Sequence, residues 1–261
     1  MDPICVNFAV SWIPRPGSAL ARFGAGWTGW CADRGDAEVS QELRAIAKGR
    51  KGVPGSISRH GLHAHIKSPF ALDDDSDVAS VQEAIASVAR TTAPITLPRM
   101  EVTVFDGRVV MALAQPDPAV TRLVCAVASV VDPHLETPAY ADEPDMGVSH
   151  PALRDWGSCD MSVIERFHIP LTDRLELGVA YQVVADLRAI LDPILTAEVS
   201  LADLALVGDP GDGQPWRLLE RYQLTGSPGR DRTASARTRS GTGITGKQFG
   251  AHISGFNSLI A

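Results

Sequence analysis

The stretch at residues 61–70, G-L-H-A-H-I-K-S-P-F, places two histidines two residues apart in a short apolar run that is typical of a β-strand. Successive side chains of a strand point to opposite faces, so His63, His65 and Lys67 are expected on one face. The pattern therefore predicts a strand that carries two imidazoles and a lysine on the same surface.

A second run, R-F-H-I-P-L-T-D-R-L at residues 166–175, places His168 in a similar strand-like setting in the second half of the chain. An unperturbed histidine has a pKa near ~6.5 and can hold or release a proton at neutral pH. If the two strands face each other across a cleft, His63 and His168 can form an acid/base pair. One imidazole would activate water or a hydroxyl, and the other would protonate the leaving oxygen.

The composition is that of an ordinary soluble globular protein: 261 residues, 44% hydrophobic and 21% charged, with a formal net charge of -7. This acidic balance argues against a dedicated nucleic-acid binder. Four cysteines without a C-x-x-C pair suggest neither a disulfide framework nor a zinc ribbon. The N-terminus has no positively charged leader, and no run approaches the roughly 18 apolar residues of a membrane span. We therefore expect a reduced, cytoplasmic setting and no membrane partner.

Hydrophobic periodicity and turn signals predict a mixed order of strands and helices. The expected strands are 4–13, 61–70, 163–172, 198–207 and 216–224, with a hairpin over 95–114 that turns at Asp106 and Gly107. The expected helices are 19–30, capped by Ser18, one that ends at Arg90 after the acidic run 73–77, 116–131, and 175–191, which stops near Pro193. Helices segregated from hairpin-paired strands indicate an α+β fold with antiparallel sheets.

The two histidine runs resemble the paired histidine motifs of the 2H phosphoesterase superfamily. They resemble more closely its branch associated with phosphonate-metabolism genes, a domain of unknown function. The resemblance extends to residues 16–29, 156–168 and 215–222. It implies a two-lobed α+β domain over residues 1–225, with lobes of roughly 1–131 and 150–225. Antiparallel sheets would line a central cleft, with helices packed outside.

The resemblance also implies site residues. His63 and His168 match the two catalytic histidines. His65 and Pro170 stand where the superfamily motif has threonine or serine, so both hydroxyls that help to hold the phosphate are missing. His65 would still donate a charge-assisted hydrogen bond to an anion if it were protonated, whereas proline has no donor to offer.

Further substrate-binding residues are expected around the two strands. Lys67 and Arg166 would place positive charge beside an anionic substrate, and Thr172 would supply a hydroxyl. Arg15, Arg59 and His60 lie in loops that could overhang the cleft. The expected substrate is a small phosphorylated or otherwise anionic metabolite, small nucleotides included, and no cofactor is expected.

Three readings of the site are open. The favoured one is phosphodiester or cyclic phosphate hydrolysis. The others are a diverged cyclase, isomerase or lyase that reuses the two histidines, and a non-catalytic ligand-binding protein. His63, His65 and His168 could also form a three-histidine zinc set. We expect no metal, because no acidic second-shell partner is identifiable and the superfamily works without one.

The C-terminal segment 226–261 is rich in Gly, Ser, Thr and Arg and is expected to be a flexible tail. It contains G-T-G-I-T-G-K-Q at 241–248, which fits the spacing of a phosphate-binding loop. A phosphate loop needs a preceding strand and a following helix, yet only Phe249–Ala261 follows, and Gln248 replaces the required Ser or Thr. We therefore reject a nucleotide-binding loop here.

Overall fold

The computed structural model describes residues 5–36, 40–135, 167–211 and 213–227. All of them belong to one compact unit, Met1–Pro228. The expected tail lies outside the described residues from 228 onward. Its predicted start at 226 is wrong, because the backbone N–H groups of Thr225 and Gly226 donate to Ala89 and Thr92 at the end of a helix.

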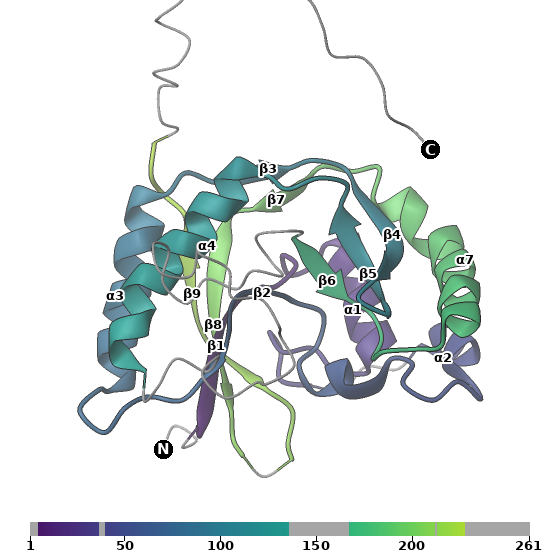
Figure 1. The fold of residues 1–261 in the computed structure, drawn as a ribbon, viewed down its shortest axis with the longest axis horizontal. Helices are drawn as coiled ribbons and strands as arrows, with labels where there is room; N and C mark the ends of the chain where they lie inside the picture. Colours follow the sequence, from purple (N-terminus) through teal and green to yellow (C-terminus); the bar gives the residue numbers. More distant parts are fainter. Residues whose placement is uncertain (1–4, 37–39, 136–166, 212, 228–261) are drawn as a thin grey trace, which may run out of the picture. The chain divides into compact units, whose positions relative to one another are not determined.

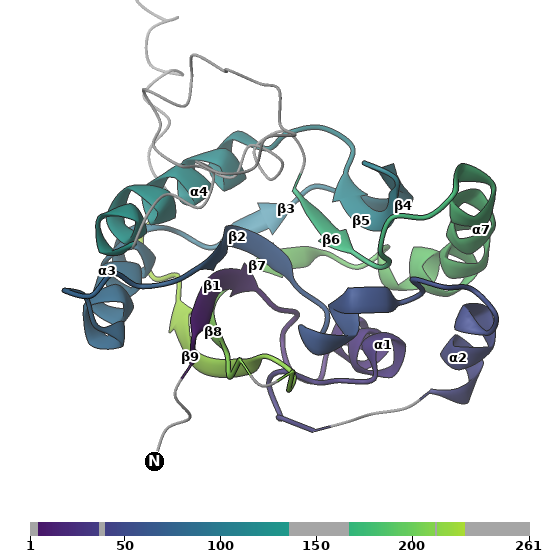
Figure 2. The same cartoon turned by 60° about the horizontal axis from the view of Figure 1, so that its bottom comes forward.

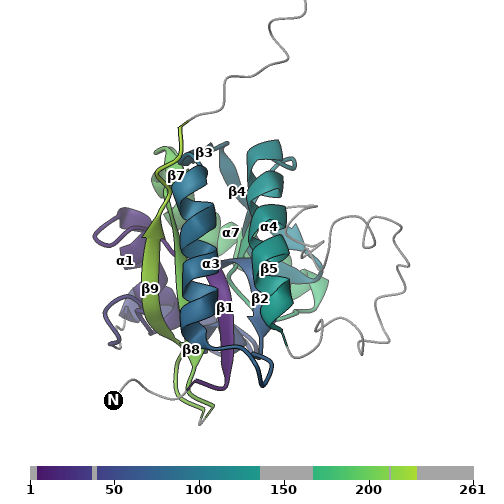
Figure 3. The same ribbon diagram turned by 90° about the vertical axis from the view of Figure 1, so that its left-hand side faces the viewer.

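The largest sheet in the described part has four antiparallel strands in the order β2-β1-β8-β9 (Figure 1). Its strands are β1 (Asn7–Trp12), β2 (Ala64–Phe70), β8 (Asp203–Asp209) and β9 (Arg217–Gln223). Helices α3 (Val78–Thr91) and α4 (Pro118–Val131) lie side by side against one face of this sheet (Figure 3). We call this side the helix face and the opposite side the histidine face.

Both helices begin where the sequence indicates. Asp77 accepts a hydrogen bond from the Ser80 N–H, and Asp117 accepts from the N–H groups that follow Pro118. Helix α3 packs an apolar stripe into the core, because Val81, Ile85 and Val88 are all buried. The caps and the stripe together fix the position of α3 on the sheet.

A second sheet pairs β4 (Met100–Phe105), β5 (Arg108–Leu113) and β6 (His168–Pro170). The hairpin between β4 and β5 turns at Asp106 and Gly107, both with positive φ, as the Asp-Gly signal predicts. Helix α7 (Leu177–Ile194) packs on this sheet (Figure 1). It contains Pro193 in its last turn, so it ends slightly later than predicted.

The remaining elements connect and cover these two sheets. They are β3 (Ile95–Leu97) paired with β7 (Val199–Leu201), helices α1 (Ala19–Thr28) and α2 (Gln41–Ala47), and the 3₁₀ turns η1 (Gly55–Arg59) and η2 (Asp132–His134). Ser18 caps α1 as predicted. Helix α2 lies in a polar stretch for which the sequence suggested no helix.

The α+β class with antiparallel sheets is confirmed. The predicted division into lobes at 1–131 and 150–225 is wrong, because each sheet in the described residues combines strands from both halves of the chain. In the four-stranded sheet, for example, Ser11 lies opposite Ala205. Antiparallel partners can be any distance apart in sequence, and local periodicity does not reveal them.

The buried core continues from the helix face of the first sheet to the second sheet and α7. A smaller apolar cluster covers the histidine face and contains Ala9, Ile13, Ala32, Ala205, Val207 and Trp216. Of the helices that the structure describes, none has the length and apolar character needed to span a bilayer.

Candidate active site

A break in the strand alternation separates Lys67 from the histidines. His65 lies opposite Ser11 and Lys67 lies opposite Val10, with an irregular register between these two pairs. Directly opposite residues share a face of the sheet, and the neighbours Val10 and Ser11 point to opposite faces. Lys67 therefore lies on the helix face and His65 on the histidine face. The prediction that they share a surface is wrong, because a bulge shifts the alternation.

Lys67 is engaged in the interior of the protein. Its side chain is 4% exposed, and Nζ donates to Oδ1 of Asp132 at the C-terminal end of α4. This ion pair joins α4 to β2 on the helix face. The predicted contact between Lys67 and a substrate is therefore not available in this arrangement.

Thr172, another expected substrate-binding residue, is engaged with the backbone. Thr172 is fully buried, its hydroxyl donates to the Asp173 carbonyl, and it accepts from the Val109 N–H on β5. This hydroxyl holds two backbone segments together and is not available for a phosphate, which corrects the expectation. Arg166 lies outside the described residues.

His63 is held in one orientation by its own chain. Its Nδ1 lies 2.9 Å from the Gly61 carbonyl, and its Nε2 lies 3.2 Å from Nε2 of His65. A carbonyl only accepts, so Nδ1 of His63 carries the proton, and neutral His63 presents a lone pair at Nε2. His65 then donates its Nε2–H to that lone pair.

The Gly61 carbonyl is positioned by a conformation that favours glycine. Gly61 has a φ of 73°, and an added Cβ would lie 3.3 Å from the backbone oxygen of Trp30. The turn before β2 thus selects glycine and directs its carbonyl to Nδ1 of His63. This local device determines the tautomer of the histidine.

A third imidazole, that of His60, lies beside His63. His60 follows η1, and its ring centroid lies 5.1 Å from that of His63 and 4.8 Å from that of Trp216. Sequence reasoning placed His60 in a loop near the cleft but did not select it as a site residue. Its association with Trp216 depends on a contact between segments far apart in the chain.

His168 approaches this group from the second sheet. It pairs with Ala112 on β5, its ring lies 5.2 Å from that of Phe105, and β6 packs beside β2 (Figure 2). It is close enough for its charge to lower the pKa of both His63 and His65. The structure therefore brings His63, His65 and His168 into electrostatic range, together with His60.

The cluster disfavours protonation. Burial, then the charge of His60, lowers the pKa of His63 to about 4, against a smaller opposing effect of the Gly61 hydrogen bond. Burial and then the charge of His63 hold the pKa of His65 well below 6.5. Both imidazoles are therefore neutral at pH 7 in this arrangement. As a neutral imidazole, His65 offers an anion an ordinary N–H donor without a positive charge.

Three cavities lie near the histidine strand and helix α2, and no histidine lines any of them. One cavity of about 290 Å³ lies beside the histidine strand, with Leu62, Ile13 and Asp33 in its wall, but no imidazole lines it. Two further cavities lie around the loops that flank α2. Within the described ranges, no three His, Cys, Asp or Glu side chains are grouped so that they could hold a metal ion.

The fold and the site define an α+β protein in which two strands from different sheets bring histidines together. A family model matches residues 65–217, and the chain belongs to this family, described as protein of unknown function (DUF1045). No curated protein matches the chain.

The solved structures that are similar to this one at low identity include those of LigT and Usb1. Escherichia coli LigT complexed with 3'-AMP is 12% identical over 85% of this chain and 98% of that chain, with a TM-score of 0.44. LigT complexed with phosphate gives a TM-score of 0.42 with the same identity and coverage. Usb1 of Kluyveromyces marxianus is 10% identical over 84% of this chain and 97% of that chain, with a TM-score of 0.33.

Proposed function

We propose that this protein is a 2H-phosphoesterase-like enzyme that uses His63 and His168 as an acid/base pair on a small phosphorylated metabolite. One observation carries the proposal. Nδ1 of His63 is bound by the Gly61 carbonyl, so a lone pair at Nε2 points into a cluster that His168 enters from the other sheet. An oriented imidazole beside a second imidazole is the arrangement that proton transfer requires.

The reaction proceeds by proton transfer at both ends of the scissile bond. His63 takes a proton from water at Nε2 as the water oxygen attacks phosphorus. The bond from phosphorus to the leaving oxygen breaks, and a protonated His168 gives its proton to that oxygen. An imidazole with a pKa of about 4 is a weak base. A bound phosphodiester, which carries one negative charge, would raise the pKa of His63, because a nearby negative charge favours the imidazolium.

His65 takes the place of the missing hydroxyl in this proposal. As a neutral imidazole it has one N–H donor, at Nε2, which points to His63. In the proposed complex this N–H donates its hydrogen bond to a phosphate oxygen instead, and Nε2 of His63 is then open to water. The resemblance to the 2H superfamily, and to its branch associated with phosphonate-metabolism genes, supports the reaction class.

A second candidate is a diverged enzyme that uses the same pair for a cyclase, isomerase or lyase reaction. It is favoured by the hydrogen bond between His63 and His65, since the superfamily motif has a hydroxyl at the second position. Pro170, which replaces the other hydroxyl, removes a further phosphate contact. A non-catalytic binder is the third candidate, and turnover distinguishes it from the other two.

The test is a turnover screen with linear and 2',3'-cyclic phosphodiesters. We expect His63→Gln and His168→Gln each to reduce kcat by about 10²-fold or more. His134→Gln is the matched control, because His134 lies outside the cluster and bonds to Ser76. A wild type that hydrolyses none of these esters supports the diverged enzyme or the binder. Equal turnover by the wild type and both cluster variants would end the acid/base proposal.

A further inference from the structure

Four buried polar side-chain atoms have no hydrogen-bond partner among the described residues. They are Ser11 Oγ, His65 Nδ1, Arg221 Nη2 and Arg59 Nε. Proteins pair nearly all of their buried polar groups, so each such atom requires an explanation. Ser11 is 1% exposed, and its hydroxyl has no evident structural role.

The sheet register places three of these residues in one row. Ser11 on β1 lies opposite His65 on β2 and, on its other side, opposite Ala205 on β8. Ala205 in turn lies opposite Arg221 on β9. Directly opposite residues point to the same face, so the row crosses the whole sheet on the histidine face. Ala205 has only a methyl group, which leaves room for the long arginine to reach toward β1.

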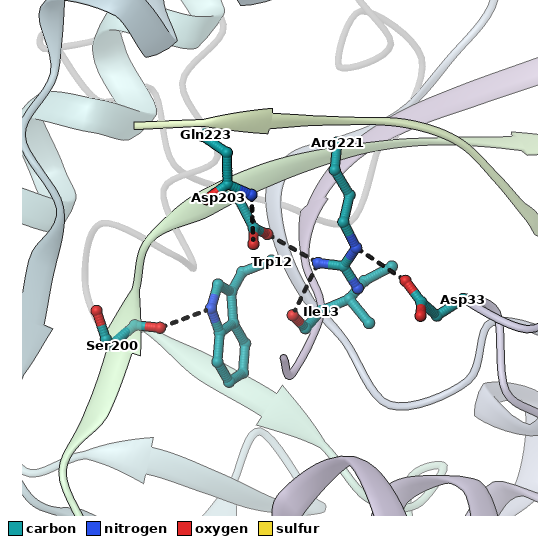
Figure 4. Close-up of polar contacts among 7 residues, drawn as sticks. All are labelled: Trp12, Ile13, Asp33, Ser200, Asp203, Arg221 and Gln223. Carbon is teal, nitrogen blue, oxygen red and sulfur yellow. Dashed lines mark hydrogen bonds and ion pairs between the residues drawn. The ribbon is translucent and has the colours of Figure 1, made fainter. Parts of the chain in front are cut away.

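At the other end of the row, Arg221 is partly buried and held by several polar contacts (Figure 4). Nε of Arg221 donates to Asp33, Nη1 donates to Asp203 at 2.8 Å, and Nη1 also lies 3.4 Å from the Ile13 carbonyl. Its side chain is 15% exposed, and Nη2 remains as an unused donor. Two carboxylates against one guanidinium leave this end with a net negative charge. An anionic group of a substrate is therefore disfavoured at Arg221, and an uncharged oxygen that accepts from Nη2 is favoured.

A cavity lies next to the partners of the arginine. Ile13 and Asp33, which both contact Arg221, line this cavity of about 290 Å³. Leu62, the neighbour of His63, lies in its wall as well. Arg221, Ser11 and His65 do not line it themselves.

We propose that the row from His65 to Arg221 binds the uncharged, hydroxyl-bearing part of the substrate whose phosphate lies at the histidine cluster. This inference rests on the proposed function and adds the chemical class of the organic group. A substrate hydroxyl donates to Nδ1 of His65 and accepts from Ser11, and a second oxygen accepts from Nη2 of Arg221. A hydroxylated carbon chain or a sugar satisfies all three atoms, whereas an alkyl chain satisfies none.

The test compares two phosphate esters with the same five-carbon skeleton, ribitol 5-phosphate and n-pentyl phosphate, by isothermal titration calorimetry. We expect the wild type to bind the ribitol ester at least about tenfold more tightly, since each buried hydrogen bond contributes roughly that factor. In Ser11→Ala, the affinity for the ribitol ester should fall about tenfold, and that for the pentyl ester should stay the same.

Thermal stability provides a second readout. Ser11→Ala removes an unpaired buried hydroxyl, so the melting temperature should stay the same or rise. Thr28→Val is the matched control. Thr28 is also buried, but its hydroxyl bonds to the Gly24 carbonyl, so this variant should melt lower and bind both esters as the wild type does.

The outcomes separate the two proposals. If the ribitol ester has no advantage, or if the advantage survives Ser11→Ala, the subsite is wrong even where both esters bind through the histidines. A lower melting temperature for Ser11→Ala also overturns it. If both esters bind His63→Gln as tightly as the wild type, the phosphate site is wrong. If neither ester binds the wild type, both proposals are overturned.

Discussion

The ion pair between Lys67 and Asp132 allows a quantitative test of the strand geometry. The two side chains differ in exposure, at 4% for Lys67 and 23% for Asp132. Asp132→Ala leaves a buried ammonium without this carboxylate, and breaking a buried pair in this way costs about 3–5 kcal/mol. Lys67→Met leaves a carboxylate that reaches water, so we expect a smaller cost of about 1–3 kcal/mol.

The double variant Lys67→Met/Asp132→Leu removes both charges together. Replacing a buried ion pair by apolar residues is often close to neutral, so this variant should be more stable than Asp132→Ala alone. Urea denaturation measures the free energies of unfolding. The slope of this free energy against urea concentration should be the same for all variants. For a chain of this size, Asp132→Ala should lower the melting temperature by about 10 °C, at about 2–4 °C per kcal/mol.

Ligand binding decides between the structural and the substrate-binding role of this lysine. Lys67→Met should bind phosphate esters as the wild type does, because its side chain lies on the helix face. The reasoning is refuted if Lys67→Met destabilises the protein more than Asp132→Ala. It is refuted equally if Lys67→Met abolishes ester binding and leaves stability unchanged, which would return the lysine to the site.

Three further predictions concern stability. The folded-state pKa of His63, about 4, lies below the usual 6.5. At 1.36 kcal/mol per pH unit, the free energy of unfolding should therefore fall by roughly 3 kcal/mol as the pH drops from about 6.5 to 4, and then level off. Urea titrations of His63→Gln should show a flatter decline with pH. An unchanged dependence of stability on pH in this variant would contradict the pKa. Gly61→Ala should cost about 1–2 kcal/mol in thermal denaturation because φ is positive, and should also slow turnover; a variant as stable as the wild type would contradict the turn geometry. Truncation after Ser227 should leave the melting temperature nearly unchanged, whereas truncation after Leu224 removes two backbone hydrogen bonds to α3 and should lower it.

Local signals in the sequence predicted the local elements well. The turn at Asp106 and Gly107, the cap at Ser18 and the buried stripe of α3 each depend on residues a few positions apart. The face of Lys67 did not follow from the sequence, because the bulge in β2 exists only against its partner β1. Alternation alone cannot show where a strand is irregular.

The candidate site was predicted only in part, because some of its contacts join segments that are far apart in the sequence. The motif resemblance selected His63, His65 and His168, and the charge of His168 acts on the other two imidazoles. His60 was not selected, because its neighbour Trp216 comes from the far end of the chain. The row through Ser11 depends on a register across four strands, and no spacing in the sequence signals it.

The histidine cluster itself can be observed directly by long-range ¹H–¹⁵N NMR of the imidazole nitrogens across a pH titration. The acid/base account predicts that His63 is neutral at pH 7 with its proton on Nδ1, and that His168→Gln raises the pKa of His63 by removing a neighbouring positive charge. A His63 with its proton on Nε2, or one that is charged at pH 7, would contradict the account. A His63 titration that does not respond to His168→Gln would contradict it as well, because the two imidazoles would then not share a site.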